Sequence, residues 1–300
     1  MRKTLILCLG MVGFSLGMFT KTFANERIVA SKHHITRVIE VGAFDHIQLN
    51  GSTDIIYTPT TGQQKLSLTL PDNLVDVVQV YVKDRTLFME MKSSASVEIG
   101  NGSRVELYVA APMVESVTLN GSGDISISSH AVSQKSLDLT INGSGDIDSK
   151  DIQSSALTAT VNGCGDMNVG KITANQVQAT VNGAGDLTVS AIQAECLNAT
   201  VNGVGDLTAK GIQAKQATAA VNGMGDVHLM GCCEEANYEL AGMGDISAKR
   251  LKAKKVTAHI IAGMGDIDCY ASESIVMIQK RNQDAITYIG NPKHVERKHK

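Results

Sequence analysis

The chain has 300 residues, 43% of them hydrophobic, with a formal net charge of −3 and no tryptophan. With 27 basic and 30 acidic side chains it lacks the excess of positive charge that a non-specific nucleic-acid-binding protein needs.

Residues 1–24 have the pattern of a secretory signal peptide. Arg2 and Lys3 form a basic start, residues 5–19 are apolar, and Ala24 ends a small-residue cleavage site. The alternative is an N-terminal membrane anchor, but the apolar run is shorter than the roughly 20 residues that a membrane-spanning helix needs. We therefore predict export to the periplasm, the cell surface or the medium, without a membrane-spanning segment. Cleavage would remove three basic residues and no acid, leaving a formal charge of −6.

Residues 25–37 show no periodicity, and we predict a flexible leader there. From 38 to 113, short runs of alternating apolar and polar residues predict β-strands, but without a clean repeat. Phe44–Asp54 ends in Gly51-Ser52-Thr53-Asp54, a degenerate copy of the motif that dominates the rest of the chain. We interpret 38–113 as irregular N-terminal coils of one domain that spans 38–291, because the terminal repeats of solenoids are atypical.

From 114 to 270 the motif Gly-x-Gly-Asp recurs eight times, at steps of 19 to 22 residues, with asparagine before the first glycine in six copies. A fixed period near 20 residues is the signature of a solenoid. The motif residues are Asn120, Gly121, Gly123, Asp124, Asn142, Gly143, Gly145, Asp146, Asn162, Gly163, Gly165, Asp166, Asn182, Gly183, Gly185, Asp186, Asn202, Gly203, Gly205, Asp206, Asn222, Gly223, Gly225, Asp226, Gly242, Gly244, Asp245, Gly263, Gly265 and Asp266.

Each copy of the motif follows an alternating strand. Leu157, Ala159 and Val161 alternate with Thr158 and Thr160, and the same pattern recurs one period later. Such a strand cannot bury its apolar face alone, whereas stacked coils bury it between them. We therefore predict an all-β, right-handed parallel β-helix with about 20 residues per coil and about 4.8 Å between coils. Residues 271–291 are predicted to be closing strands, and 292–300 a disordered basic tail, since Pro292 cannot donate to a strand ladder.

Residues 38–291 resemble a family of exported bacterial proteins, the auto-transporter adhesins with a head GIN domain. The resemblance lies in Phe44–Asp54, in Val114–Asp124 and in the Asn-Gly-x-Gly-Asp copies that follow. It implies a right-handed β-helix similar to that of pectin lyases, no recognised catalytic residues, and a role in adhesion or surface attachment. This chain departs from the family in its many regular copies and in having Ala241 and Ala262 where asparagine is expected.

The motif residues have a structural explanation. We expect glycine to supply a positive φ in each turn, and each aspartate to accept hydrogen bonds from N–H groups of its own turn. The alternative for the aspartates is a ladder of calcium sites, because calcium binds carboxylate oxygens, but calcium-binding β-rolls have a nine-residue period. We expect the asparagine side chains to hydrogen-bond from coil to coil. No metal or cofactor is predicted.

The residue between the two glycines changes from small to large along the chain. If it faces outward, Val204, Met224, Met243 and Met264 form an apolar stripe suited to a partner; if it faces inward, it fills the core. The cysteines after the signal peptide occupy different positions of the repeat, so we expect mostly free thiols, with Cys232 and Cys269 buried. They are Cys164, Cys196, Cys232, Cys233 and Cys269.

No catalytic residues are predicted, because the histidines follow no nucleophile–base pattern and the absence of tryptophan disfavours sugar stacking. Two functions remain open. The first is an exported, non-enzymatic β-helix that attaches to a cell-surface or matrix glycan or protein. The second is a polysaccharide-binding or polysaccharide-degrading protein on the same scaffold. The sequence leaves open whether the protein forms an oligomer.

Overall fold

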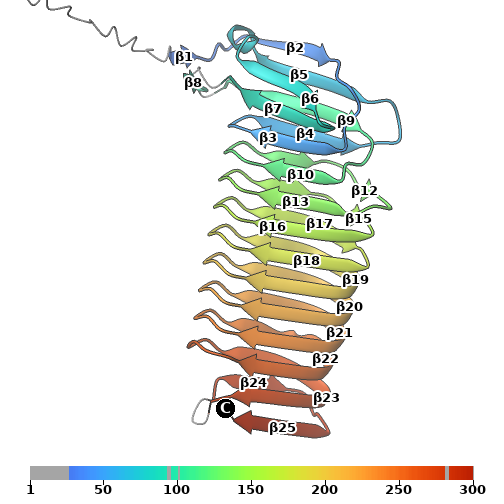
Figure 1. The fold of residues 1–300 in the computed structure, drawn as a ribbon, viewed down its shortest axis with the longest axis vertical. Helices are drawn as coiled ribbons and strands as arrows, with labels where there is room; N and C mark the ends of the chain where they lie inside the picture. The colour runs from blue at the N-terminus through green and yellow to red at the C-terminus, as the bar shows by residue number, and fades with distance from the viewer. Residues whose placement is uncertain (1–26, 93–95, 101, 281–283, 300) are drawn as a thin grey trace, which may run out of the picture.

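The computed structural model describes residues 27–92, 96–100, 102–280 and 284–299, so the predicted signal peptide lies outside the described residues. The described chain is a β-solenoid of about 9 turns with about 20 residues per turn. It forms a tall column with a broader cap of strands at its N-terminal end (Figure 1). The prediction of an all-β solenoid is confirmed. In the part of the chain that the structure describes, no helix is long and apolar enough to cross a membrane.

The strands fall into three groups along the chain. The N-terminal group is β1 (Arg27–Val29), β2 (His34–Ile39), β3 (His46–Asn50), β4 (Asp54–Pro59), β5 (Lys65–Pro71), a 3₁₀ turn (Asp72–Leu74), β6 (Val78–Lys83), β7 (Thr86–Met91), β8 (Ser96–Glu98) and β9 (Glu106–Ala111). The regular coils contain β10 (Ser116–Leu119), β11 (Ile125–Ile127), β12 (Ala131–Val132), β13 (Leu137–Ile141), β14 (Ile147–Ser149), β15 (Ile152–Gln153), β16 (Ala156–Val161), β17 (Met167–Thr173), β18 (Gln176–Val181), β19 (Leu187–Val201), β20 (Leu207–Val221), β21 (Val227–Leu240), β22 (Ile246–Ile260) and β23 (Ile267–Gln279). The closing group is β24 (Ile286–Ile289) and β25 (His294–His299).

Successive coils pair in parallel, in the register that the repeat predicts. Leu157 is the partner of Val177, Val177 of Leu197, and Leu197 of Ala217. The early coils are made of short separate strands, whereas from β19 onward each coil is one bent strand of 13 to 15 residues. The inward positions of all these coils form one long core, in which Ala159, Ala179, Ala199 and Ala219 are at most 1% exposed. The small alanine side chains suit the narrow interior.

The first coil is completed by a segment that is distant in sequence. Strand β10 stacks directly on β3, with Ser116 as the register partner of His46, 70 residues earlier. Between them the chain leaves the column and builds the cap, in which β2 pairs with β5, β5 with β9 and β6 with β7, all antiparallel. Mixed strand directions explain why 38–113 shows strand patterns without the repeat. The single-domain assignment for 38–291 remains a prediction.

Both predicted unstructured ends contain strands. In the leader predicted for 25–37, β1 pairs with β8 and β2 pairs with β5, so this prediction is wrong for 27–29 and 34–37. In the predicted basic tail, β25 pairs in parallel with β23. Pro292 therefore does not end the strand ladder, which resumes after it. The last coil would otherwise leave the edge of β23 unpaired, and a strand rich in Lys, Arg and His covers that edge while discouraging further pairing.

A one-residue deletion changes which cysteine is buried. The coil from Asp226 to Asp245 is one residue short, and Gly231 takes the register position next to Ile212. Cys232 is therefore exposed and Cys233 is buried, so the predicted burial of Cys232 is wrong, whereas Cys269 is buried as expected. All five described cysteines are free thiols. Gly231 has a φ of 142°, and a Cβ there would lie 2.2 Å from the carbonyl oxygen of Ile212.

Candidate functional site

We call the Gly-x-Gly-Asp turn of each coil the motif corner. Glycine is required there because the backbones of successive coils approach each other closely. A Cβ on Gly183 would lie 1.9 Å from the carbonyl oxygen of Gly163 in the preceding coil. The corresponding distance is 1.7–2.1 Å for every motif glycine from Gly121 to Gly265. The expected positive φ is wrong for the motif glycines except Gly263, whose φ is 96°. Close backbone stacking, rather than turn geometry, therefore selects glycine.

The asparagine column (Asn120, Asn142, Asn162, Asn182, Asn202 and Asn222) is hydrogen-bonded from coil to coil, as predicted. Each Nδ2 donates to the Oδ1 of the asparagine one coil earlier at 2.8–2.9 Å. Asn120 donates in the same way to Asn50 at 2.8 Å, so the degenerate first copy starts the column. The column ends where Ala241 replaces asparagine. These bonds fix the orientation of each amide on the outer surface.

The aspartate column (Asp124, Asp146, Asp166, Asp186, Asp206, Asp226, Asp245 and Asp266) also joins coils. The Oδ1 of Asp166 accepts the backbone N–H of Asp186 at 2.8 Å, and the other members repeat this contact at 2.7–2.9 Å. The expected bonds within each aspartate's own turn are therefore wrong, because the nearest unpaired N–H belongs to the next coil. Burial raises the pKa of Asp54, which starts the column, above its ordinary value. No group of three or more His, Cys, Asp or Glu among the described residues could hold a metal ion.

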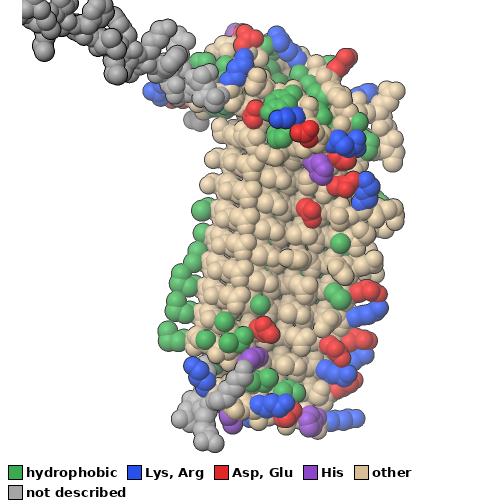
Figure 2. Space-filling view, in the orientation of Figure 1, with side chains coloured by type: hydrophobic (Ala, Val, Ile, Leu, Met, Phe, Trp, Pro, Cys, Tyr) green, Lys and Arg blue, Asp and Glu red, His purple; other side chains and the backbone are tan. Residues whose placement is uncertain are grey.

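The side chains between the two motif glycines point outward. Val204, Met224, Met243 and Met264 are 50%, 56%, 55% and 80% exposed, so they do not fill the core. Figure 2 shows hydrophobic side chains in a line along one edge of the column. We call these four residues the apolar ridge. At about 4.8 Å per coil, the ridge spans roughly 14 Å and is one side chain wide.

A file of threonines runs beside the asparagine column. The threonine file consists of Thr118, Thr140, Thr160, Thr180 and Thr200, which are register partners in five successive coils. All five are half-buried, and among the described residues their hydroxyls have no hydrogen-bond partner in the protein. In the sequence these threonines stand out only as the polar half of the alternating strands. Aligning the copies on their aspartates would have shown the file.

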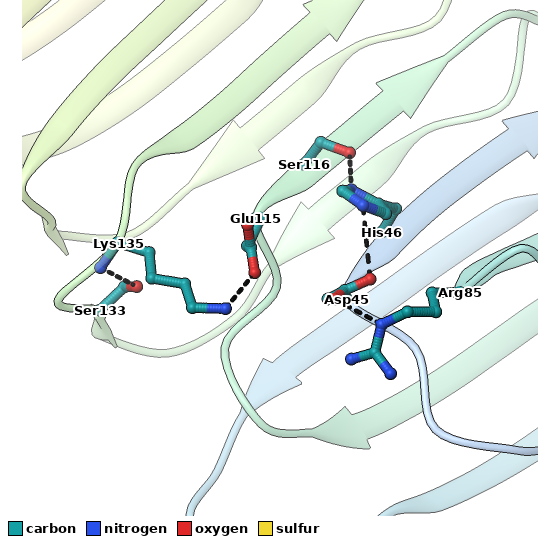
Figure 3. A network of polar contacts seen from close by, with 7 residues as sticks. All are labelled: Asp45, His46, Arg85, Glu115, Ser116, Ser133 and Lys135. Carbon is teal, nitrogen blue, oxygen red and sulfur yellow. Dashed lines mark hydrogen bonds and ion pairs between the residues drawn. The ribbon is translucent and has the colours of Figure 1, made fainter.

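A polar network joins the cap to the first regular coil (Figure 3). The Oγ of Ser116 lies 2.8 Å from Nδ1 of His46, and Nε2 of His46 lies 3.3 Å from Oδ1 of Asp45. Nε of Arg85, from the turn between β6 and β7, donates to Oδ2 of Asp45 at 2.8 Å and holds the pKa of that carboxyl below its ordinary value. Glu115, next in the chain to Ser116, pairs with Lys135.

Serine, imidazole and carboxylate in this order are the groups of a nucleophilic triad, and the histidine pattern of the sequence did not predict this arrangement. The signal was present, because aligning Glu115-Ser116 with Asp45-His46 on their motif copies stacks serine on histidine. The surroundings indicate a structural role. Arg85 already pairs with the carboxylate, and β10 is bonded to a strand on each side, which engages the backbone N–H groups that an oxyanion would need. These contacts link the turn between β6 and β7 to the start of β3 and to β10.

A shallow groove of about 490 Å³ lies over the strands that follow the motif corner. Its lining is polar and includes Asp148, Lys150, Asp151 and Asn168. Asp148 accepts the side-chain amide of Asn168 at 3.1 Å, and Asp151 accepts the backbone N–H of Lys171 at 2.8 Å. Both carboxylates are therefore engaged by the next coil, as in the aspartate column.

Comparison with known proteins fits this architecture. The family described as "Putative auto-transporter adhesin, head GIN domain" matches residues 43–209 and 189–292, which is most of the chain. The protein belongs to this family. No match is found among curated proteins.

Solved structures that are described as putative adhesins have a similar fold. A structure described as "a putative adhesin" from Bacteroides fragilis is 26% identical, with a TM-score of 0.57 over 80% of this chain and 98% of that one. Two others with that description, from Parabacteroides distasonis and Parabacteroides merdae, are 17% and 16% identical, with TM-scores of 0.53 and 0.55. They cover 91% and 90% of this adhesin-family chain and 100% and 98% of their own. At these identities the last two show the fold alone.

Proposed function

We propose that the protein is an exported, non-enzymatic adhesin that attaches to a protein on a cell surface or in a matrix. Membership of the adhesin family supports attachment. The observation that carries the proposal is the apolar ridge, in which four large apolar side chains, 50–80% exposed, follow one another along one edge. Exposed apolar side chains gathered in one place mark interaction sites more often than scattered ones do.

The ridge favours a protein partner over a glycan. Three of its four residues are methionines, whose flexible, polarizable side chains adapt to apolar grooves. A convex line one side chain wide fits a groove of a larger partner, and buried apolar anchors dominate the energy of such interfaces. A glycan would instead need aromatic platforms, and the ridge has none.

The proposal is tested by adhesion of beads that carry the protein to host or bacterial cells. We expect the double variant Met224→Ser and Met243→Ser to lose most binding, because these residues lie at the centre of the ridge. The matched control is Val38→Ser with Val132→Ser, since both side chains are exposed and lie outside the ridge. Equal binding by the two double variants would rule out the ridge as the attachment surface.

Export and the absence of enzymatic activity have separate tests. Amino-terminal sequencing of protein secreted from an expressing bacterium should give Asn25 as the first residue, and an intact Met1 would contradict cleavage after Ala24. In a screen of neutral and acidic polysaccharides with a reducing-end readout, we expect no turnover. Turnover that is lost in Asp148→Asn or Asp151→Asn would establish the polysaccharide-degrading alternative in the groove.

A further inference from the structure

The threonine file and the asparagine column together form a flat, nearly uncharged face. In each coil the two files are separated by one buried residue, as in Thr160-Val161-Asn162, so both point outward from the same sheet. A third file, two residues before the threonines, carries Ser116, Asp138, Thr158, Gln178 and Asn198. Among the described residues of these three files, Asp138 is the one charged side chain.

Charges lie elsewhere on the column. Exposed ion pairs link neighbouring coils, as between Glu195 and Lys215 at 2.6 Å and between Glu235 and Lys255 at 3.1 Å. Figure 2 shows many charged side chains along the edge away from the apolar ridge and at the two ends of the column, with a broad and mainly uncharged surface between the two edges. Charge complementarity therefore points to a neutral ligand for this surface.

The face is rigid before it binds anything. Threonine is branched at Cβ, which restricts its χ1 angle, and identical neighbours above and below restrict it further. The asparagine amides are fixed by their own ladder at 2.8–2.9 Å. A prearranged surface loses little conformational entropy on binding. The threonine hydroxyls have no protein partner among the described residues, so they are available to a ligand.

The spacing of the groups is regular in two directions. Along the column the repeat is one coil, about 4.8 Å, and across the strand the files are two residues apart, about 6.6–6.8 Å. A ligand that contacts several coils at once must therefore offer neutral hydrogen-bonding groups on a similar two-dimensional lattice. Hexagonal ice offers such a lattice, because its oxygen atoms repeat at a slightly shorter distance along the a axis and at a slightly longer distance along the c axis. A crystalline glycan is less suitable, because the three files contain no aromatic side chain on which sugar rings stack.

We propose that this face adsorbs to ice. The hydroxyl and amide groups take hydrogen-bonding positions at the crystal surface, and the threonine methyl groups pack against it. A charged side chain here would weaken adsorption, because it holds its own hydration shell. This face is distinct from the apolar ridge, so the inference goes beyond attachment to a protein partner and does not depend on it.

The test measures inhibition of ice recrystallisation and thermal hysteresis by the purified protein. We expect inhibition at micromolar concentration, and a loss of at least tenfold in potency for Thr160→Lys, at the centre of the file. The matched control is Thr188→Lys, a half-buried threonine on the strand that follows the motif corner. The control should keep the potency of the unchanged protein.

Melting curves of both lysine variants test whether they are folded. The variants Thr160→Ser and Thr160→Val remove the methyl group and the hydroxyl group separately, without adding a charge. Three outcomes would overturn the proposal. The unchanged protein could inhibit no better than an inert protein at equal concentration, the two lysine variants could lose potency equally, or the protein could bind cellulose or chitin particles through Thr160 while leaving ice growth unaffected.

Discussion

Replacing Gly183 by alanine tests why the motif needs glycine. The new Cβ would lie 1.9 Å from the carbonyl oxygen of Gly163 and 2.8 Å from the carbonyl carbon and oxygen of Asn162. None of these are movable side-chain atoms, so one coil must shift away from the other. The oxygen of Gly163 also accepts the N–H groups of Ala184 at 2.9 Å and of Gly185 at 3.3 Å, so the same shift weakens two hydrogen bonds between coils.

The expected cost follows from these contacts. Overpacking costs typically about 1–3 kcal/mol. Weakening two hydrogen bonds adds about 0.5–1.5 kcal/mol each. The reduced freedom of the unfolded chain returns about 0.4–1 kcal/mol. We therefore expect Gly183→Ala to lower the free energy of unfolding by roughly 1–6 kcal/mol, which corresponds to a fall in Tm of roughly 2–24 °C at about 2–4 °C per kcal/mol.

The assay is thermal unfolding followed by circular dichroism, with Gly42→Ala as control. Gly42 has open space around its Cβ position and no positive φ, so alanine there should leave Tm unchanged or slightly higher. Gly183→Asn separates the two explanations, because asparagine tolerates a positive φ but not the close contact. A Tm for Gly183→Ala within about 1 °C of the unchanged protein would refute the reasoning, since even the smallest expected cost corresponds to a fall of about 2 °C.

The remaining predictions concern the aspartate column and the buried polar groups. Tm should be the same in excess chelator and in excess calcium at matched ionic strength; a difference above about 10 °C would mean that the aspartates bind metal. Tyr238→Phe should leave stability unchanged or raise it by up to about 1–3 kcal/mol in urea unfolding, because the buried hydroxyl has no hydrogen-bond partner among the described residues. At pH 8 a thiol reagent should label Cys164 and Cys232 in the native protein, and Cys233 and Cys269 only after unfolding. Burial raises the pKa of each of these last two thiols to about 12, so their contribution to stability is present below pH 9 and is lost as pH rises towards 12.

The sequence by itself determined the solenoid, its period and its core. Alternation at Leu157, Ala159 and Val161 assigns the buried face, and a 20-residue repeat places each of these side chains on its equivalent in the next coil. Once that register is known, stacked asparagines must lie within hydrogen-bonding distance, which is why their ladder could be predicted. These features follow from a local pattern that is repeated in every copy of the motif.

Tertiary structure decided what depends on the contact between coils or on contacts that do not repeat. The repeat shows where each glycine lies but not why glycine is needed there. The close approach of Gly183 to Gly163 exists only after the coils have stacked. The same holds for the aspartates, whose N–H partners belong to the next coil, and for the outward direction of the apolar ridge. His46 contacts Ser116, 70 residues later in the chain, and the cap strands between them show no repeat. A single deletion before Cys232 exchanges which of the neighbouring side chains is buried and which is exposed. Local pattern fixes which face of a strand is apolar, whereas the direction of the backbone at a corner is set by the packing of one coil on another.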